Sequence, residues 1–317
     1  MGDVAKVLYP DCEQQFTASA AIAASKILQS ADGRAGYLPV QAGVASGDKT
    51  ALVVEGAVTL PKTATIVCLR GGNAYWVRST SKVTPLKSAG DFWCGTFAND
   101  AASADTTCNV MLNLPQVNKI DLMTEKWVVA NAGSGAAAIN VSNERTLDII
   151  ATNEAEKTDF LSTTSIPIVD GPIFEARVTV VTTGAGSEPD FNFGLANATH
   201  ATDADSITEH VFFHIDGNST AIRAQSKDGT TTVASTDTTV VYVASTYQEF
   251  WIDARKTTDV RIYVDGVRVL ASSTFKLNAG TGPMKALVHA EKTTSTTLFH
   301  ARVLELRVRA TDLGLGD

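Results

Sequence analysis

Residues 47–113 decide the fold class of the chain: GDKTALVVEGAVTLPKTATIVCLRGGNAYWVRSTSKVTPLKSAGDFWCGTFANDAASADTTCNVMLN. Short apolar runs, such as residues 51–60 (ALVVEGAVTL) and 74–78 (AYWVR), alternate with stretches rich in Gly, Pro, Asn and Asp. Runs of β-branched and aromatic residues between turn residues are typical of strands, and none has the length or the period of about 3.6 residues of a helix. The segment therefore predicts a small antiparallel β-domain.

Three motifs occur here in a specific order: VVEGAVTLPK, then GGNAYWV, then KVTPLKSAGDFWCGTFANDAASADTTCNVMLN. This order, over residues 36–114, resembles the head-decoration, or capsid cement, proteins of tailed phages. The resemblance implies a small β-barrel or β-tulip-like domain that binds the major capsid protein on the outer surface of the virion. It also implies a structural protein rather than an enzyme, commonly a homotrimer, that stabilises the capsid and is made in the host cytoplasm.

The second part of the chain is dense in predicted strands. Residues 172–182 (PIFEARVTVVT) alternate between apolar and polar, and residues 260–270 (VRIYVDGVRVL) place Asp265-Gly266 between two alternating runs, a strong hairpin signal. On the order of twelve strands are expected here, which suits a two-sheet jelly roll. The order GPIFEARV, EFWIDARKTTDVRIYVDGVRV, ARVLELRV resembles the concanavalin/laminin-G type of lectin-like jelly roll, which makes a glycan-binding adhesin the alternative function.

The sequence thus predicts an all-β chain with three parts: residues 1–35 as an N-terminal arm, 36–118 as the capsid-binding domain and 119–317 as the lectin-like domain. The arm contains TASAAIAASKILQ at residues 17–29, and its alanines favour a short helix. The apolar residues near or on this helix are candidates for capsid or subunit contact, with packing on the chain's own domain as the alternative: Phe16, Ile22, Ile27 and Leu28.

Composition and charge exclude several functional classes. The chain is 44% hydrophobic, enough to form cores. Residues 1–118 hold nine basic and nine acidic residues, and residues 119–317 hold 17 and 25, so the whole net charge of −8 lies in the second part. Without a basic stripe or a long apolar run, neither nucleic acid nor a membrane is an expected partner.

Four cysteines lie in the first part of the chain, at Cys12, Cys68, Cys94 and Cys108. Their spacing matches no CxxC pair and no zinc-binding pattern. The sequence leaves two interpretations open, which are reduced thiols and one disulfide between strands.

The second part holds the candidate ligand face, formed by His210, Phe212, His214 and Trp251. The first three share one face of a strand, and the two histidines lie about 13 Å apart at about 3.3 Å per residue, too far to bind one metal ion. Glu249 and Asp253 are four residues apart, which does not suit the carboxyl separation of about 5–5.5 Å in retaining glycosidases. No metal, cofactor or catalytic residue is therefore expected.

A polar loop at residues 200–206 (HATDADS) is the remaining open question of the sequence. Asp203 and Asp205 offer oxygen ligands of the kind that Ca²⁺ prefers. The alternative is an ordinary solvated loop.

Overall fold

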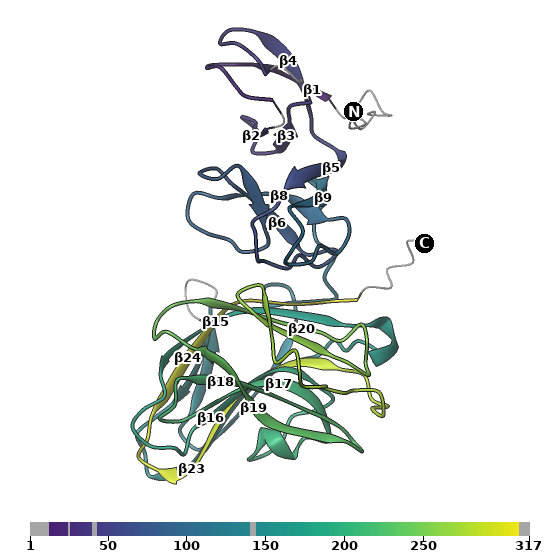
Figure 1. The fold of residues 1–317 in the computed structure, drawn as a ribbon. Helices are drawn as coiled ribbons and strands as arrows, with labels where there is room; N and C mark the ends of the chain where they lie inside the picture. Colours follow the sequence, from purple (N-terminus) through teal and green to yellow (C-terminus); the bar gives the residue numbers. More distant parts are fainter. Residues whose placement is uncertain (1–12, 25, 40–42, 140–143, 311–317) are drawn as a thin grey trace. The chain divides into compact units, whose positions relative to one another are not determined.

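The computed structural model describes residues 13–24, 26–39, 43–139 and 144–310, and the side chains of residues 136–139 are not described. In this part of the chain nearly all regular structure is antiparallel β-strand, which confirms the all-β fold class. The chain divides into two compact units, Met1–Val117 and Asn118–Asp317, hereafter unit 1 and unit 2 (Figure 1).

Unit 1 begins with a four-stranded sheet in the order β1-β4-β3-β2. Its strands are β1 (Glu13–Thr17), β2 (Ile27–Gln29), β3 (Ala35–Tyr37) and β4 (Lys49–Val53). Because β1, β2 and β3 share this sheet with β4, residues 13–37 are part of a folded sheet and not a separate arm, which corrects the expected boundary at residue 35.

The helix expected over residues 17–29 is wrong. Thr17 pairs with Lys49 at the end of β1, Ile22 forms an isolated bridge with Val44, and β2 pairs with β3. A short alanine-rich helix is only marginally stable by itself, whereas pairing with other strands supplies hydrogen bonds at both ends of this segment and at Ile22. Tertiary pairing has therefore overridden the helix propensity of the alanines.

The rest of unit 1 is a five-stranded sheet in the order β5-β9-β8-β6-β7. Its strands are β5 (Gly56–Pro61), β6 (Asn73–Val77), β7 (Lys82–Thr84), β8 (Phe92–Phe97) and β9 (Thr107–Leu112). Lys62, just after β5, bridges in parallel to Val83 of β7, and this contact joins the two edges of the sheet. The result is a small, barrel-like β-domain, in line with the β-barrel or β-tulip-like domain that the family resemblance implied.

One glycine allows the barrel to close tightly. At Gly95 in β8 a Cβ atom would lie 2.0 Å from the carbonyl oxygen of Met111 in β9, and the residue has φ of +149°. Only glycine fits such a close approach between two strand backbones. The glycine at position 95 is therefore required by the packing of β8 on β9.

Unit 2 is a sandwich of two antiparallel sheets. The first has the order β12-β13-β24-β15-β20-β21-β22, with β10 paired to β24, and the second has the order β11-β14-β23-β16-β17-β18-β19. The strands of the eight-stranded sheet are β10 (Ile120–Asp121), β12 (Ala136–Ile139), β13 (Arg145–Ile149), β15 (Ile173–Thr182), β20 (Gln248–Asp253), β21 (Arg261–Val264), β22 (Val267–Val269) and β24 (Phe299–Arg309). Those of the seven-stranded sheet are β11 (Trp127–Ala132), β14 (Glu154–Ser162), β16 (Asp190–Ala196), β17 (Glu209–Asp216), β18 (Ala221–Asp228), β19 (Thr232–Val241) and β23 (Lys285–Ser295). Among the described residues of unit 2, two short 3-10 helices accompany the strands, η2 (Ile168–Asp170) and η3 (Ala204–Ser206).

The expected hairpin forms between β21 and β22. Asp265 and Gly266 have φ of 49° and 74°, the pair of positive values that a tight two-residue turn requires. The strong local signal in the sequence therefore located this turn correctly.

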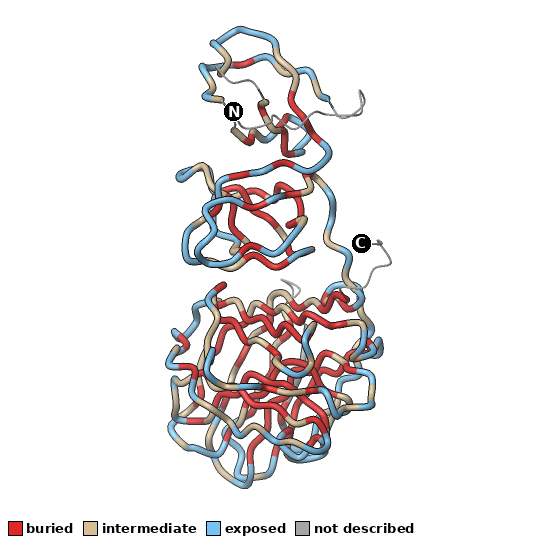
Figure 2. The backbone as a smooth tube through the Cα atoms, turned by 45° about the vertical axis from the view of Figure 1, so that its right-hand side comes forward, coloured by how far each residue is buried: buried red, intermediate tan, exposed pale blue. Residues whose placement is uncertain are grey.

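The core of unit 2 lies between its two sheets, where the buried segments gather in Figure 2. Alternate residues of each strand point into it, as the pattern of residues 172–182 predicted. Its centre is aromatic: the rings of Phe193 and Phe213 stack at 5.3 Å, and Phe250 from the opposite sheet meets both edge-on at 4.9 Å. Burial of such large rings is the main force that holds the two sheets together.

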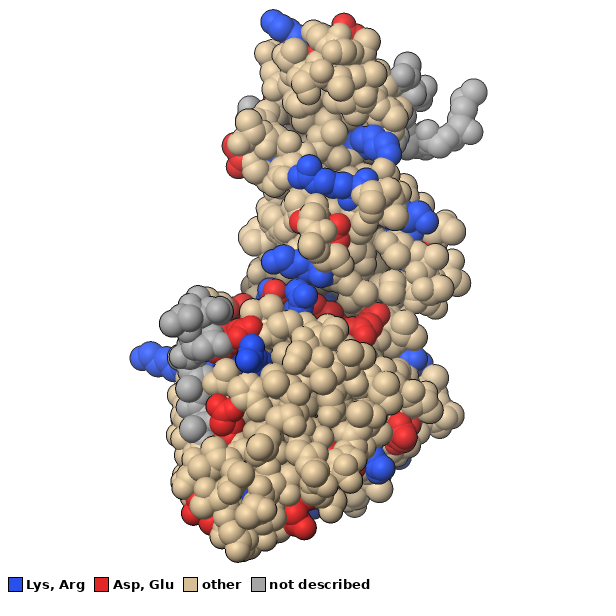
Figure 3. Space-filling model, turned by 90° about the vertical axis from the view of Figure 1, so that its left-hand side faces the viewer, with Lys and Arg blue, Asp and Glu red and all other residues tan. Residues whose placement is uncertain are grey.

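Figure 3 shows how charged side chains are distributed on one face of the molecule. On the face drawn in Figure 3, charged side chains are scattered among larger uncharged areas, without a continuous basic stripe. No helix in the described ranges has the length and the apolar character that crossing a membrane requires.

Candidate functional site

The outer face of the seven-stranded sheet carries two neighbouring rows of polar side chains, hereafter the charged face. The first row crosses five paired strands, with one residue each from β14, β23, β16, β17 and β18: Asp159, His289, Asn192, His214 and Arg223. Alternate residues of the same strands, such as Val288 and Phe213, belong to the core between the sheets. The polar row therefore points away from the core.

The second row lies beside the first. It is two residues earlier in β14 and β16, at Lys157 and Asp190, and two residues later in β23 and β17, at Glu291 and Asp216. Residues opposite each other in paired strands have neighbouring side chains. The register thus gathers charged groups that are far apart in the sequence.

Much of the charged face is buried. The side chains of Asp159, Asn192 and His289 are fully buried, and those of Lys157 and Glu291 nearly so. Charges persist in such places only when they are paired. Lys157 Nζ lies 3.1 Å from Asp159 Oδ2, and His289 Nε2 lies 2.5 Å from Glu291 Oε2.

His289 lies between two carboxylates, because its Nδ1 is 3.4 Å from Asp159 Oδ2. Burial lowers the pKa of this imidazole, but the contacts with Asp159 and Glu291 outweigh burial and raise the pKa above its usual value. His289 is therefore stabilised as the charged imidazolium.

The loop of residues 197–208, which contains η3, covers part of the charged face. The Thr199 hydroxyl donates to Asp159, and the backbone N–H of Ala204 donates to both carboxylate oxygens of Glu291 at 3.1 and 3.2 Å. Gln225 of β18 donates to Asp205. Apolar packing completes this cover, since Ala204 and Ile207 form a cluster with strand residues of the sheet: Leu161, Ala196, Phe212 and Leu287.

The two aspartates of this loop are engaged within the protein. Asp203 accepts from the backbone N–H of Asp205 at 2.8 Å and from the Ser206 hydroxyl at 2.9 Å, and so caps η3. Asp205 accepts from Gln225. These bonds give both carboxylates a structural role in shaping the loop.

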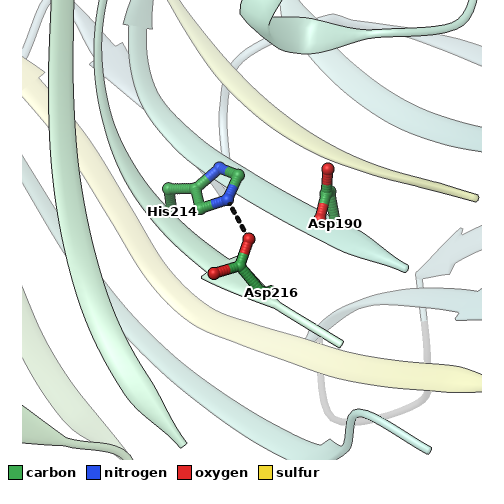
Figure 4. Close-up of side chains that lie close together, drawn as sticks. All are labelled: Asp190, His214 and Asp216. Atoms are coloured by element: carbon green, nitrogen blue, oxygen red, sulfur yellow. Dashed lines mark hydrogen bonds and ion pairs between the residues drawn. The ribbon is translucent and has the colours of Figure 1, made fainter. Parts of the chain in front are cut away.

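At one end of the charged face, Asp190, His214 and Asp216 form a compact trio with ligand-type atoms all within 4.8 Å of one another. His214 Nε2 donates to Asp216 Oδ1 at 2.6 Å and Nδ1 donates to Asn192 Oδ1 at 2.8 Å. Asp190 comes from the adjacent strand and lies opposite Asp216 in the register (Figure 4).

The electrostatics of the trio follow from burial and from its surplus of carboxylates. The pKa of Asp190 is raised to about 7, chiefly by burial; the positive His214 opposes this rise, while the charges of Asp216, Glu291 and Asp205 add to it. Burial lowers the pKa of His214, but the hydrogen bond to Asp216 and the charges of Asp190 and Asp205 outweigh burial and raise it. The pKa of Asp216 is lowered by its bond to His214.

The predicted ligand residues on β17 lie on the charged face but are not open to solvent. His210 and Phe212 are buried, and their rings stack at 4.4 Å with an interplanar angle of 5°. His210 Nδ1 is 3.0 Å from the carbonyl oxygen of Ile207 in the covering loop, and burial lowers the pKa of His210 to about 4. Both side chains therefore hold the loop against the sheet.

Trp251 lies elsewhere. It belongs to β20 in the eight-stranded sheet, faces away from the core and packs against Tyr263 at a ring distance of 6.0 Å. Trp251 therefore does not share a face with His210, Phe212 and His214, and the single ligand face expected from the sequence is wrong in this respect.

In unit 1 the four candidate contact residues face inward. Phe16, Ile22 and Leu28 are half-buried against a small cluster formed by Leu38, Leu52 and Val54. Ile27 is buried in the larger core that also holds Val58, Leu60 and Trp76. Their contact with a capsid or another subunit stays a prediction, and the structure gives each of them a packing role within unit 1.

The three described cysteines, Cys68, Cys94 and Cys108, are free thiols and buried. Burial raises the pKa of Cys94 to about 12. Cys68 donates a hydrogen bond toward Cys108, which lowers the pKa of Cys108. Cys12 lies outside the described residues.

Sequence reasoning missed most of the charged face, including Asp159, Asp190, His289 and Glu291. The available signal was polar residues at alternate positions in KTDF (157–160), DFN (190–192) and HAE (289–291). That period of two predicts a polar strand face. This period does not reveal, however, which strands lie side by side in the sheet.

One family model matches this chain. The family model for phage cement proteins matches residues 11–112, which lie within unit 1, and this confirms the resemblance noted in the sequence. No curated protein matches the chain.

Solved structures similar to this chain include the carbohydrate recognition domain of Emp47p, with a TM-score of 0.43, 12% identity, and coverage of 60% of this chain and 93% of that one. A carbohydrate-binding module, CBM66 from Bacillus subtilis, has a TM-score of 0.38, 10% identity, and coverage of 57% and 95%. The Crh5 transglycosylase has a TM-score of 0.41, 16% identity, and coverage of 60% and 80%. Likeness at this level carries no inference about activity, and the two-sheet architecture of unit 2 rests on its own strand pairing.

Proposed function

We propose that this protein is a structural component of a tailed-phage virion that decorates the outer surface of the capsid. Unit 1 attaches to the major capsid protein, and unit 2 is displayed outward. One observation carries the proposal: the match to phage cement proteins lies within one compact unit, while the other unit has a separate core of its own.

The attachment is expected to depend little on charge. Residues 1–118 hold equal numbers of basic and acidic residues, so no net charge steers this unit toward a partner surface. Apolar contacts and hydrogen bonds then supply most of the binding energy, and these are screened by salt much less than exposed ion pairs are. In the same proposal the protein assembles as a homotrimer and bridges neighbouring capsid subunits.

The proposal assigns no catalytic activity to the chain. Asp253 forms an ion pair with Arg255 at 2.7 Å, whereas Glu249 lies 3.8 Å from Arg177 and burial raises its pKa to about 8. The two residues are four apart on β20, a spacing that does not suit the carboxyl pair of a retaining glycosidase. A reducing-sugar assay on polysaccharides from host cells tests this expectation. A glycan array tests the adhesin alternative, for which the buried His210, Phe212 and His214 offer no open aromatic surface.

Binding to capsids that lack the protein tests the proposed function. The full chain, residues 1–117 and residues 118–317 are each incubated with such capsids, after circular dichroism has shown that each fragment is folded. We expect the full chain and residues 1–117 to bind with similar affinity, with at most a few-fold loss between low and moderate salt. Binding of residues 118–317 alone would contradict the proposed orientation, and binding by none of the three would contradict the function.

A further inference from the structure

The trio at the end of the charged face has the donor set of a metal site. It offers one imidazole nitrogen from His214 and carboxylate oxygens from Asp190 and Asp216, all within 4.8 Å of one another. Metal–ligand distances of about 2.0–2.2 Å put the ligand atoms of one ion at most about 4.4 Å apart. A small rotation of one carboxylate is therefore enough to close the trio around an ion.

The orientation of His214 also suits a ligand. Metal-binding histidines usually donate their second ring N–H to a fixed oxygen, which points the other nitrogen at the metal. Here Nδ1 donates to Asn192 Oδ1 at 2.8 Å, and Nε2 faces Asp216 Oδ1 at 2.6 Å. An ion would take the place of the proton on Nε2.

A second observation points to a missing ligand. Asn192 is fully buried, yet its Nδ2 has no hydrogen-bond partner among the described groups. A buried amide N–H₂ without a partner is costly. Because the other end of the same amide is bonded to His214, this unpaired donor lies next to the trio and lacks an acceptor there, such as a water molecule.

Charge and access also favour a cation. Asp205 Oδ1 lies 3.9 Å from His214 Nδ1 and adds a third carboxylate, while Arg223 engages the other oxygen of Asp216 at 3.2 Å. Carboxylates therefore outnumber the permanent positive charges around the site. The Asp216 side chain is 34% exposed, so an ion can enter from solvent.

We propose that Asp190, His214 and Asp216 bind one divalent cation of the kind that accepts imidazole as well as carboxylate ligands, Zn²⁺ or Mn²⁺. The mixed nitrogen and oxygen donors favour these ions over Ca²⁺ and Mg²⁺, which prefer oxygen ligands alone. The ion links β16 to β17 and neutralises the repulsion between their carboxylates. This site is independent of the proposed capsid contact. It was not expected from the sequence, because Asp190 joins His214 and Asp216 only through the pairing of β16 with β17.

The test is calorimetric titration of the full chain, dialysed first against EDTA, with ZnCl₂, MnCl₂, CaCl₂ and MgCl₂ in separate experiments. We expect one equivalent of Zn²⁺ or Mn²⁺ to bind at least tenfold more tightly than Ca²⁺ or Mg²⁺. Asp190→Asn and His214→Gln should each weaken this binding by about 10–100-fold. His300→Gln is the matched control, because His300 pairs with a single carboxylate, Asp148, in the other sheet, and it should bind like the wild type.

A measurement on the wild type keeps the proposal testable even if a variant fails to fold. Nitrogen NMR of ¹⁵N-histidine-labelled protein should show one imidazole whose Nε2 resonance moves to the position of a metal-bound nitrogen when Zn²⁺ is added. If neither Zn²⁺ nor Mn²⁺ binds at a concentration of about 1 mM, the proposal is overturned. Equal binding of Ca²⁺, unchanged binding in both site variants, or a titration that leaves all Nε2 resonances in place would also overturn it.

Discussion

The buried ion pair between Lys292 and Glu156 gives the sharpest prediction about the stability of unit 2. The two side chains face each other from β23 and β14, both are 0% exposed, and Lys292 Nζ lies 3.0 Å from Glu156 Oε1. The ammonium also donates to three carbonyl oxygens, those of Ile150 at 2.5 Å, Thr152 at 2.8 Å and Thr297 at 3.3 Å. Lys292 therefore joins the end of β13 and the turn before β24 to the core.

Lys292→Met removes the charge but keeps most of the apolar stem. Glu156 is then left buried with one hydrogen bond, from the backbone N–H of Ile150 at 2.9 Å. Breaking a buried ion pair on one side costs about 3–5 kcal/mol. For a domain of this size, about 2–4 °C per kcal/mol converts the loss into a fall in Tm of about 6–20 °C.

Differential scanning calorimetry of the full chain measures this loss, with Lys256→Met as the matched control. Lys256 is 65% exposed and 3.8 Å from Asp259, so the same substitution there should change stability by less than about 1 kcal/mol. The double variant Lys292→Met with Glu156→Gln should recover part of the loss, because no charge is then left buried. Equal effects of the two single variants would refute this reasoning.

Three further predictions concern unit 1 and the charged face. Ile27→Ala should lower the free energy of unfolding of unit 1 by about 2–5 kcal/mol, measured by urea unfolding, because Ile27 is buried. Ile22→Ala should lower it by less, because Ile22 is only half-buried. In a thiol assay, Cys68, Cys94 and Cys108 should react fast only after unfolding, since all three are buried. The raised folded pKa of His289 means that its contribution to the free energy of unfolding is complete below the unfolded pKa of about 6.5 and is lost as pH rises through the folded value. His289→Gln should therefore differ most from the wild type at pH 6 and least at pH 9, and a difference that does not change with pH would contradict this prediction.

Local signals in the sequence located some of the strands and one of the turns. The Asp265-Gly266 turn and the alternating residues 172–182 were located correctly, because turn chemistry and side-chain alternation are properties of neighbouring residues. The segment from Thr17 to Gln29 was predicted wrongly as a helix. Its strand pairing depends on Val44, Lys49 and β3, which are distant in the sequence and do not affect local helix propensity.

The candidate site was harder to predict for the same reason. His210 and His214 were correctly expected on one strand face. Of the groups around His214, however, only Asp216 belongs to the same strand, and Asp190 and Asn192 come from the neighbouring strand β16. Trp251 was grouped with them although its strand belongs to the other sheet. Strand order fixes which side chains meet, and a single sequence does not reveal strand order.

The most direct test of the central claim is a cryo-EM reconstruction of the virion that carries this protein. The account predicts density for residues 13–117 in contact with the outer surface of the capsid shell, and density for residues 118–310 farther from the shell. Unit 2 in contact with the shell and unit 1 away from it, or no density for this chain on the capsid, would contradict the account.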